Sequence, residues 1–246
     1  MSQKDAPTQR EEGLGYFEES RSFAFGIASI IPLAVLYQCG IVQSGYTQRN
    51  LAEVWLSGPM RLLGLEAATA LNVLLVVAFV AVLWRSDRSW AFHWSVVAAV
   101  VAEAGLYAVA LYKGGPLLAG LLNERACGLF FSLGQKGAAP FLLALGAGVY
   151  EELLFRLLLI GGVAWMLHKL WGWDKVCSVG VMLVVSSILF SLAHYVGPLG
   201  EPARTYSFFF RAVCGLALGM VFLWRGLGVA VWTHAIYNGL VMLLPA

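Results

Sequence analysis

The stretch GVYEELLFRLLLIGGV, residues 148–163, decides how this sequence is interpreted, because it places three charges in an otherwise apolar run. The charged residues are Glu151, Glu152 and Arg156. Charges at membrane depth are costly, so they usually face the interior of a helix bundle and mark a site or a pathway. The stretch therefore predicts a membrane-spanning helix that carries a functional polar group.

The composition indicates an integral membrane protein. Hydrophobic residues make up 60% of the chain, charged residues make up 12%, and the mean hydropathy is +0.77. Soluble domains carry about 25% charged residues. The net charge of +2 is spread over the chain and forms no basic face, so a nucleic-acid partner is not expected. The lipid bilayer is the partner that the composition predicts.

Apolar runs long enough to cross a bilayer recur along the chain. We expect an all-α fold, a polytopic transmembrane bundle of seven or eight helices. Residues 1–22 form a polar N-terminal tail, and residues 23–246 form one transmembrane domain. A weaker run at 116–133, interrupted by Glu124 and Arg125, spans the membrane, re-enters it or lies at its surface. The lysines and arginines of the loops do not decide the orientation. The expected spans are residues 23–42, 67–84, 92–112, 140–167, 176–196, 208–224 and 227–244.

Spacing separates the two glutamates. Glu152 and Arg156 are four residues apart, so they share a helix face and can form an ion pair. Glu151 points about 100° away around an α-helix. We therefore expect Arg156 to keep Glu152 ionised and to leave Glu151 free for chemistry.

Two later spans carry further polar groups. His194 lies near the end of its span, while His234 and Asn238 are four residues apart on the last helix. Singly, such groups are ordinary hydrogen-bonding partners between transmembrane helices. Together with Glu151 they suit hydrolysis, since a carboxylate can act as general base and hydrogen-bond donors can stabilise an oxyanion.

The polar residues in the spans could also form other kinds of catalytic site, a metal site or structural ion pairs. The sequence has no GxSxG and no HExxH motif, which argues against a serine hydrolase of that type and a common zinc protease. A zinc site built from Glu151, His194 and His234 is chemically possible. We expect no metal and no cofactor, because these ligands come from three separate helices. Glu103 can pair with Arg211 or with another basic group.

Three motifs carry a resemblance to a known family. EELLFR at 151–156, FSLAH at 190–194 and HAIYN at 234–238 resemble the EExxxR, FxxxH and HxxxN motifs of the CPBP family. This family comprises CAAX-prenyl proteases, bacteriocin-processing proteins and their relatives. The resemblance covers about residues 138–245, which would be the catalytic core.

The resemblance implies an intramembrane glutamate protease. Glu151 with His194 would activate a water, and His234 with Asn238 would form the oxyanion site. Three further residues would support this geometry: Glu152, Arg156 and Phe190.

The implied substrate is a protein or peptide in or at the membrane. CAAX-type cleavage, processing of secreted peptides and processing of C-terminal sorting tails, as by myxosortases, all remain open, as does the oligomeric state. The expected location is the inner membrane of a bacterium. Two alternatives are a transporter or channel with a proton relay through buried Glu and His, and a non-catalytic bacteriocin-immunity scaffold. The transporter is disfavoured because no internal repeat is detectable.

Overall fold

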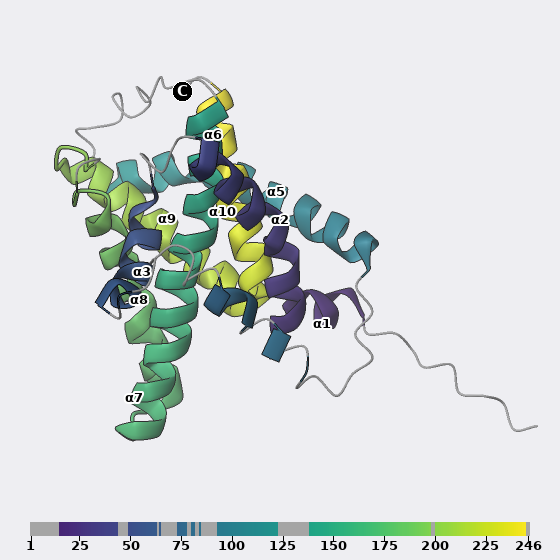
Figure 1. The fold of residues 1–246 in the computed structure, drawn as a ribbon. Coiled ribbons are helices and arrows are strands. Elements are labelled where there is room, and N and C mark those ends of the chain that lie inside the picture. The colour runs from purple at the N-terminus through teal and green to yellow at the C-terminus, as the bar shows by residue number, and fades with distance from the viewer. Residues whose placement is uncertain are drawn as a thin grey trace, which may run out of the picture.

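The computed structural model describes residues 15–43, 49–62, 64, 73–77, 80–81, 84, 93–122, 138–197 and 200–244. In these segments every regular element is a helix, as Figure 1 shows. The elements are α1 (Tyr16–Arg21), α2 (Phe23–Gln43), α3 (Leu51–Leu62), α5 (Trp94–Leu122), α6 (Ala138–Gly146), η2 (Ala147–Glu151), η3 (Leu153–Val163), α7 (Ala164–Leu170), α8 (Lys175–Ala193), α9 (Thr205–Arg225) and α10 (Leu227–Leu243).

The expected all-α membrane bundle is confirmed. Within the described segments, five helical stretches are long and apolar enough to cross a membrane, namely α2, α5, Ala144–Leu170, α8 and α9, and α10 is a shorter apolar helix. Most of the expected span at 67–84, and residues 123–133 of the weaker run, lie outside the described residues. The total of seven or eight helices therefore stays a prediction.

Three boundaries differ from the expectation. Residues 16–21 of the polar tail form α1, which buries Glu19 and Ser20, and α3 forms where no helix was expected. Helix α5 continues through Pro116 to Leu122 instead of ending near Tyr112. Packing explains the last difference, since α5 lies against α9 and α10, and the Pro116 carbonyl accepts a hydrogen bond from Tyr206 at 3.4 Å. Tertiary contacts of this kind outweigh local propensity.

The segment that carries the two glutamates is not a regular α-helix. Helices α6, η2, η3 and α7 follow one another as one rod, which runs from the top to the bottom of Figure 1. Its middle part, Ala147–Glu151 and Leu153–Val163, is π-helical, with backbone hydrogen bonds of the i→i+5 type. Such wider turns are rare and occur frequently at functional sites.

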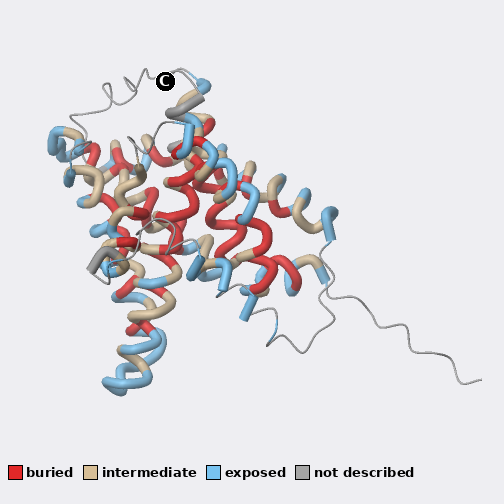
Figure 2. Tube along the Cα trace, viewed as in Figure 1, coloured by how far each residue is buried: buried red, intermediate tan, exposed pale blue. Residues whose placement is uncertain are grey.

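Helix α10 lies at the centre of the bundle and packs against α2, α5, α6, η2 and α9. Figure 2 shows buried residues along the helices at this centre, while exposed residues lie mostly toward the outside. Many of the exposed side chains are large and apolar, for example Leu106 and Val176. In a bilayer these outer side chains face the lipid chains, and the polar groups of the core are shielded from them.

Two glycines set the position of α10. Gly226 has a φ of 88°, a conformation that favours glycine, and it turns the chain sharply from α9 into α10. Gly148 of η2 faces α10 so closely that a Cβ atom there would lie 3.0 Å from the backbone nitrogen of Ala235. The missing side chain at Gly148 lets η2 contact α10 beside His234. This contact places the two glutamates next to the last helix.

Candidate active site

Glu152 lies at the centre of a buried polar cluster. Its Oε1 atom is 3.1 Å from Nη1 of Arg156 and 2.8 Å from Nδ1 of His234. Glu152 and Arg156 are both fully buried. The ion pair expected from their spacing is therefore present, and Glu152 also contacts the imidazole of the last helix.

Arg156 is fixed by two further contacts. Its Nη2 donates to the carbonyl of Gly215 on α9 at 3.1 Å, and its guanidinium lies 4.6 Å from the centre of the Phe190 ring. Stacking on an aromatic face fixes the orientation of a guanidinium, and the ring also attracts its positive charge. Arg156 thereby connects the rod to α8 and α9.

Glu151 has different surroundings. Its Oε1 atom accepts a hydrogen bond from Nδ2 of Asn50 at 3.0 Å. Its Oε2 atom is buried, has no hydrogen-bond partner among the described residues and lies 3.9 Å from Nε2 of His234. One oxygen of Glu151 is thus held by an amide, and the other faces an imidazole.

Phe190 of α8 lies between the two histidines. Its ring meets those of His194 and His234 edge-on, with centroids 5.0 Å and 5.8 Å apart. It also packs edge-on against Phe155 of η3 at 5.5 Å. The Phe190 ring therefore packs against both imidazoles, and its supporting role in catalysis stays a prediction.

A cavity of about 200 Å³ adjoins the cluster. His194, His234 and Asn238 line this cavity. Glu151 is not a lining residue, but its Oε2 atom lies 3.9 Å from Nε2 of His234, which is one. The Nδ2 atom of Asn238 donates to the carbonyl of Ala144 at 3.2 Å, which leaves its second N–H for another acceptor. The other lining residues are mostly apolar: Leu111, Phe190, Glu201, Phe210, Arg211, Cys214, Leu218, Tyr237 and Val241.

The contacts of the two imidazoles restrict their proton positions. Nδ1 of His194 lies 2.8 Å from the carbonyl oxygen of Phe190, which accepts only, so Nδ1 carries the proton and Nε2 of neutral His194 is an acceptor. Nδ1 of His234 makes the same kind of contact with Glu152. Nε2 of His234 is therefore an acceptor when the ring is neutral and a donor only when the ring is charged.

Within the described segments, no three His, Cys, Asp or Glu side chains are grouped as ligands of a metal ion. Both ring nitrogens of His234 face carboxylates, at 2.8 Å and 3.9 Å. The expectation that the reaction uses no metal stays a prediction, and chelation tests it.

Two charged residues outside the cluster have partners that the sequence did not identify. Glu103 does not pair with Arg211 but with Arg225, at the end of α9, at 2.5 Å. Arg211 pairs instead with Glu201, at 2.6 Å, in the segment between α8 and α9. Sequence gives no register between distant helices, and this explains why the partner of Glu103 was left open.

Asn50 is the site residue that the sequence analysis missed. It lies just before α3, between the expected spans 23–42 and 67–84, and 101 positions from the glutamate that it contacts. A weak local signal exists, because an asparagine before an apolar helical run is a common N-cap. Nothing local connects that cap to Glu151.

Comparison with known proteins bears on this cluster. Residues 135–240 match the family described as type II CAAX prenyl endopeptidase Rce1-like. This part of the chain is similar to the Rce1-like family. The match spans all three motifs, and it is consistent with the resemblance of these motifs to those of the CPBP family. No curated protein and no solved structure matches the chain.

The similarity of residues 135–240 to the Rce1-like family supports protease activity, and therefore a peptide substrate. Together with the apolar helices it identifies an integral membrane protein. The family match spans 135–240, so Asn50 and Glu103 lie outside it.

Proposed function

We propose that this protein is an intramembrane endopeptidase that hydrolyses a peptide bond with a water activated by Glu151. One observation carries the proposal, namely the buried Oε2 atom of Glu151, which has no hydrogen-bond partner among the described residues and lies 3.9 Å from Nε2 of His234. That separation is too long for a direct hydrogen bond. A water in contact with both atoms would bridge it.

The first step is attack by this water. Glu151 takes a proton from the water, and the resulting hydroxide forms a bond to the carbon of the scissile carbonyl. His194, whose Nε2 is an acceptor on the cavity wall, helps to hold the water in line. General-base assistance of this kind accelerates hydrolysis by about 10² to 10⁴-fold.

The second step is stabilisation of the oxyanion. The carbonyl oxygen gains a negative charge, and the free N–H of Asn238 donates to it. A His234 ring that is already protonated before the attack also donates from Nε2 to this oxygen and keeps its proton throughout, and the carboxylate of Glu152 at Nδ1 stabilises that charged ring.

The last step breaks the C–N bond. Glu151, which holds the proton taken from the water, gives it to the leaving amine. The products are a new carboxyl terminus and a new amino terminus, and Glu151 returns to its ionised form. Arg156 takes no part in these proton transfers and stays paired with the carboxylate of Glu152 at 3.1 Å.

The cavity suits a peptide with apolar side chains beside the cleaved bond, because apolar residues form most of its wall. We propose membrane-bound or secreted proteins and peptides as substrates, with a CAAX-type terminus as one candidate and a sorting tail or a processed peptide as others. The proposed location is a bacterial inner membrane.

The test compares membranes that contain the wild-type chain with membranes that contain Glu151→Gln. Mass spectrometry of protein termini identifies any terminus that depends on Glu151, and a quenched fluorescent peptide with a farnesylated CAAX terminus is assayed in parallel. We expect the variant to lose cleavage by at least about 10²-fold while remaining folded, because glutamine keeps the shape but cannot act as a base.

The outcomes separate the candidate functions. Cleavage by Glu151→Gln at the wild-type rate would overturn the role of Glu151. If no terminus changed and the peptide stayed intact with the wild-type chain, the immunity scaffold would be favoured over the protease. A loss of ion flux without a changed terminus would favour the transporter.

A further inference from the structure

The oxygen of Glu151 that does not face His234 is held by a residue from the other half of the chain. Nδ2 of Asn50 donates to Oε1 of Glu151 at 3.0 Å. Asn50 lies far outside the segment 135–240 that matches the protease family. The family motifs therefore account for only part of the surroundings of Glu151.

The orientation of the Asn50 amide is fixed by a second contact. Its Oδ1 atom accepts a hydrogen bond from the backbone N–H of Ala52 at 2.9 Å, and its carbonyl accepts from Val54 at 3.1 Å. Asn50 is thus the N-cap of α3. Because the cap needs the oxygen as an acceptor, the nitrogen is the end of the amide that points to Glu151. Asn50 can only donate at this position.

A buried network holds the cap itself. The backbone N–H of Asn50 donates to Oη of Tyr37 at 3.0 Å, and the Tyr37 hydroxyl donates to Glu53 at 2.6 Å. Arg49 forms an ion pair with Glu53 at 2.9 Å, and Tyr37 and Glu53 are fully buried. A buried polar network with satisfied contacts rigidifies the elements that it joins.

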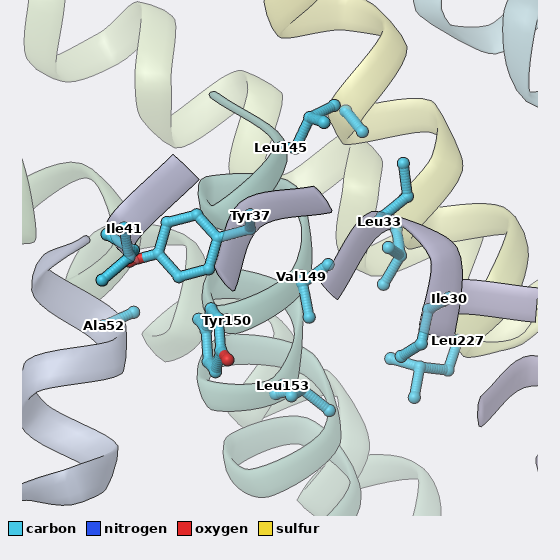
Figure 3. Close-up of a cluster of buried hydrophobic side chains, with 12 residues drawn as sticks. Ile30, Leu33, Tyr37, Ile41, Ala52, Leu145, Val149, Tyr150, Leu153 and Leu227 are labelled. Atoms are coloured by element: carbon cyan, nitrogen blue, oxygen red, sulfur yellow. The ribbon is translucent and has the colours of Figure 1, made fainter. Parts of the chain in front are cut away.

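This network adjoins the catalytic rod. The rings of Tyr37 and Tyr150 pack with centroids 5.3 Å apart, and Tyr150 directly precedes Glu151 in the chain. Figure 3 shows both tyrosines in the core between α2, α3 and η2. The backbone and the side chain of Glu151 are therefore supported from the same side.

We propose that Asn50 is a positioning residue for the hydrolysis. It acts through Glu151, by fixing Oε1 so that Oε2 is presented to the water beside His234. The inference rests on the proposed role of Glu151 as the base. It adds that α2 and α3, which lie outside the family match, complete the active site of this chain. Small displacements of a catalytic group can reduce a rate by up to about 10²-fold.

Two substitutions separate positioning from capping. Asn50→Ser and Asn50→Asp both keep an oxygen that can cap α3, and both remove the N–H that reaches Glu151. We expect kcat to fall at least about tenfold in both variants, with KM and thermal stability of Asn50→Ser close to those of the wild type. The aspartate variant should lose more, because its carboxylate opposes that of Glu151.

The assay uses the full chain in detergent. The probe is the farnesylated CAAX peptide or, if that is not cut, a peptide spanning the terminus that depends on Glu151. Asp174→Ala is the matched control. Asp174 is the N-cap of α8, and its side chain accepts a hydrogen bond from the backbone N–H of Cys177 at 2.9 Å. That control should lower stability and leave kcat unchanged. Wild-type kcat in both Asn50 variants, with Glu151→Gln inactive, would overturn the inference and leave the proposed function standing.

A spectroscopic readout does not depend on the substrate. The infrared carboxylate band of Glu151 is obtained as the difference between the wild type and Glu151→Gln. The same difference is then taken in the Asn50→Ser background. Loss of the amide donor should shift the band, and an unchanged band would refute the contact. If Glu151→Gln cleaves normally while the band shifts, the contact stands and the proposed function fails.

Discussion

Glu152→Gln tests how much the buried ion pair between Glu152 and Arg156 contributes to the stability of the fold. Glutamine keeps the shape of the side chain and an oxygen that can still accept from Nδ1 of His234. It removes only the negative charge that lies 3.1 Å from Arg156. The substitution therefore isolates the ion pair from the hydrogen bond.

The expected magnitude follows from burial. Removing one partner of a buried ion pair costs about 3–5 kcal/mol, because the other charge is left uncompensated. Glu152 and Arg156 are both fully buried, so solvent does not screen them. The charge of Glu151 also acts on Arg156 and offsets part of the loss. We therefore expect a decrease of about 3 kcal/mol in the free energy of unfolding.

The assay is unfolding in mixed micelles with increasing SDS, followed by helical circular dichroism. Glu18→Gln, at an exposed position of α1, is the matched control and should change stability by less than about 0.5 kcal/mol. The double variant Glu152→Gln with Arg156→Met removes both charges. It should be at least as stable as Glu152→Gln alone, since no buried charge is left unpaired.

Two results would refute the reasoning. One is a Glu152→Gln variant within about 1 kcal/mol of the wild type, which would mean that the pair is hydrated or unformed in the membrane. The other is a double variant whose loss equals the sum of the two single losses. Additive losses indicate that two residues do not interact.

Two further predictions concern metal and packing. Prolonged treatment of the purified protein with a strong chelator should leave cleavage unchanged, and stoichiometric bound zinc with activity restored by added zinc would make Glu151 a ligand instead of a base. Gly148→Ala should cost about 1–3 kcal/mol and reduce kcat, because the new Cβ would meet the backbone of Ala235 and push η2 away from α10. Gly105→Ala on α5 is its control, since among the described residues no atom beyond the neighbouring backbone of its own helix lies within 4 Å of the added Cβ. Equal stability of the two variants would contradict the close packing at Gly148.

The sequence by itself determined the class of fold and most residues of the polar cluster, but not Asn50. Long apolar runs predict membrane helices because each residue's contribution to burial in lipid is local and additive. The spacing of four between Glu152 and Arg156 predicts their pairing within one helix, and the pair is present at 3.1 Å. The wider π turns of this segment still leave them in contact.

Only the tertiary structure decided which separate helices share partners. The contact between Asn50 and Glu151 joins residues 101 positions apart, and the pairing of Glu103 with Arg225 joins residues 122 positions apart. No local pattern encodes such distances, because they depend on the register between packed helices. The close approach of η2 to α10 at Gly148 sets that register for the site. It brings His234 to both glutamates at once, with Nδ1 at Glu152 and Nε2 facing Glu151, which the order of the motifs along the chain does not specify.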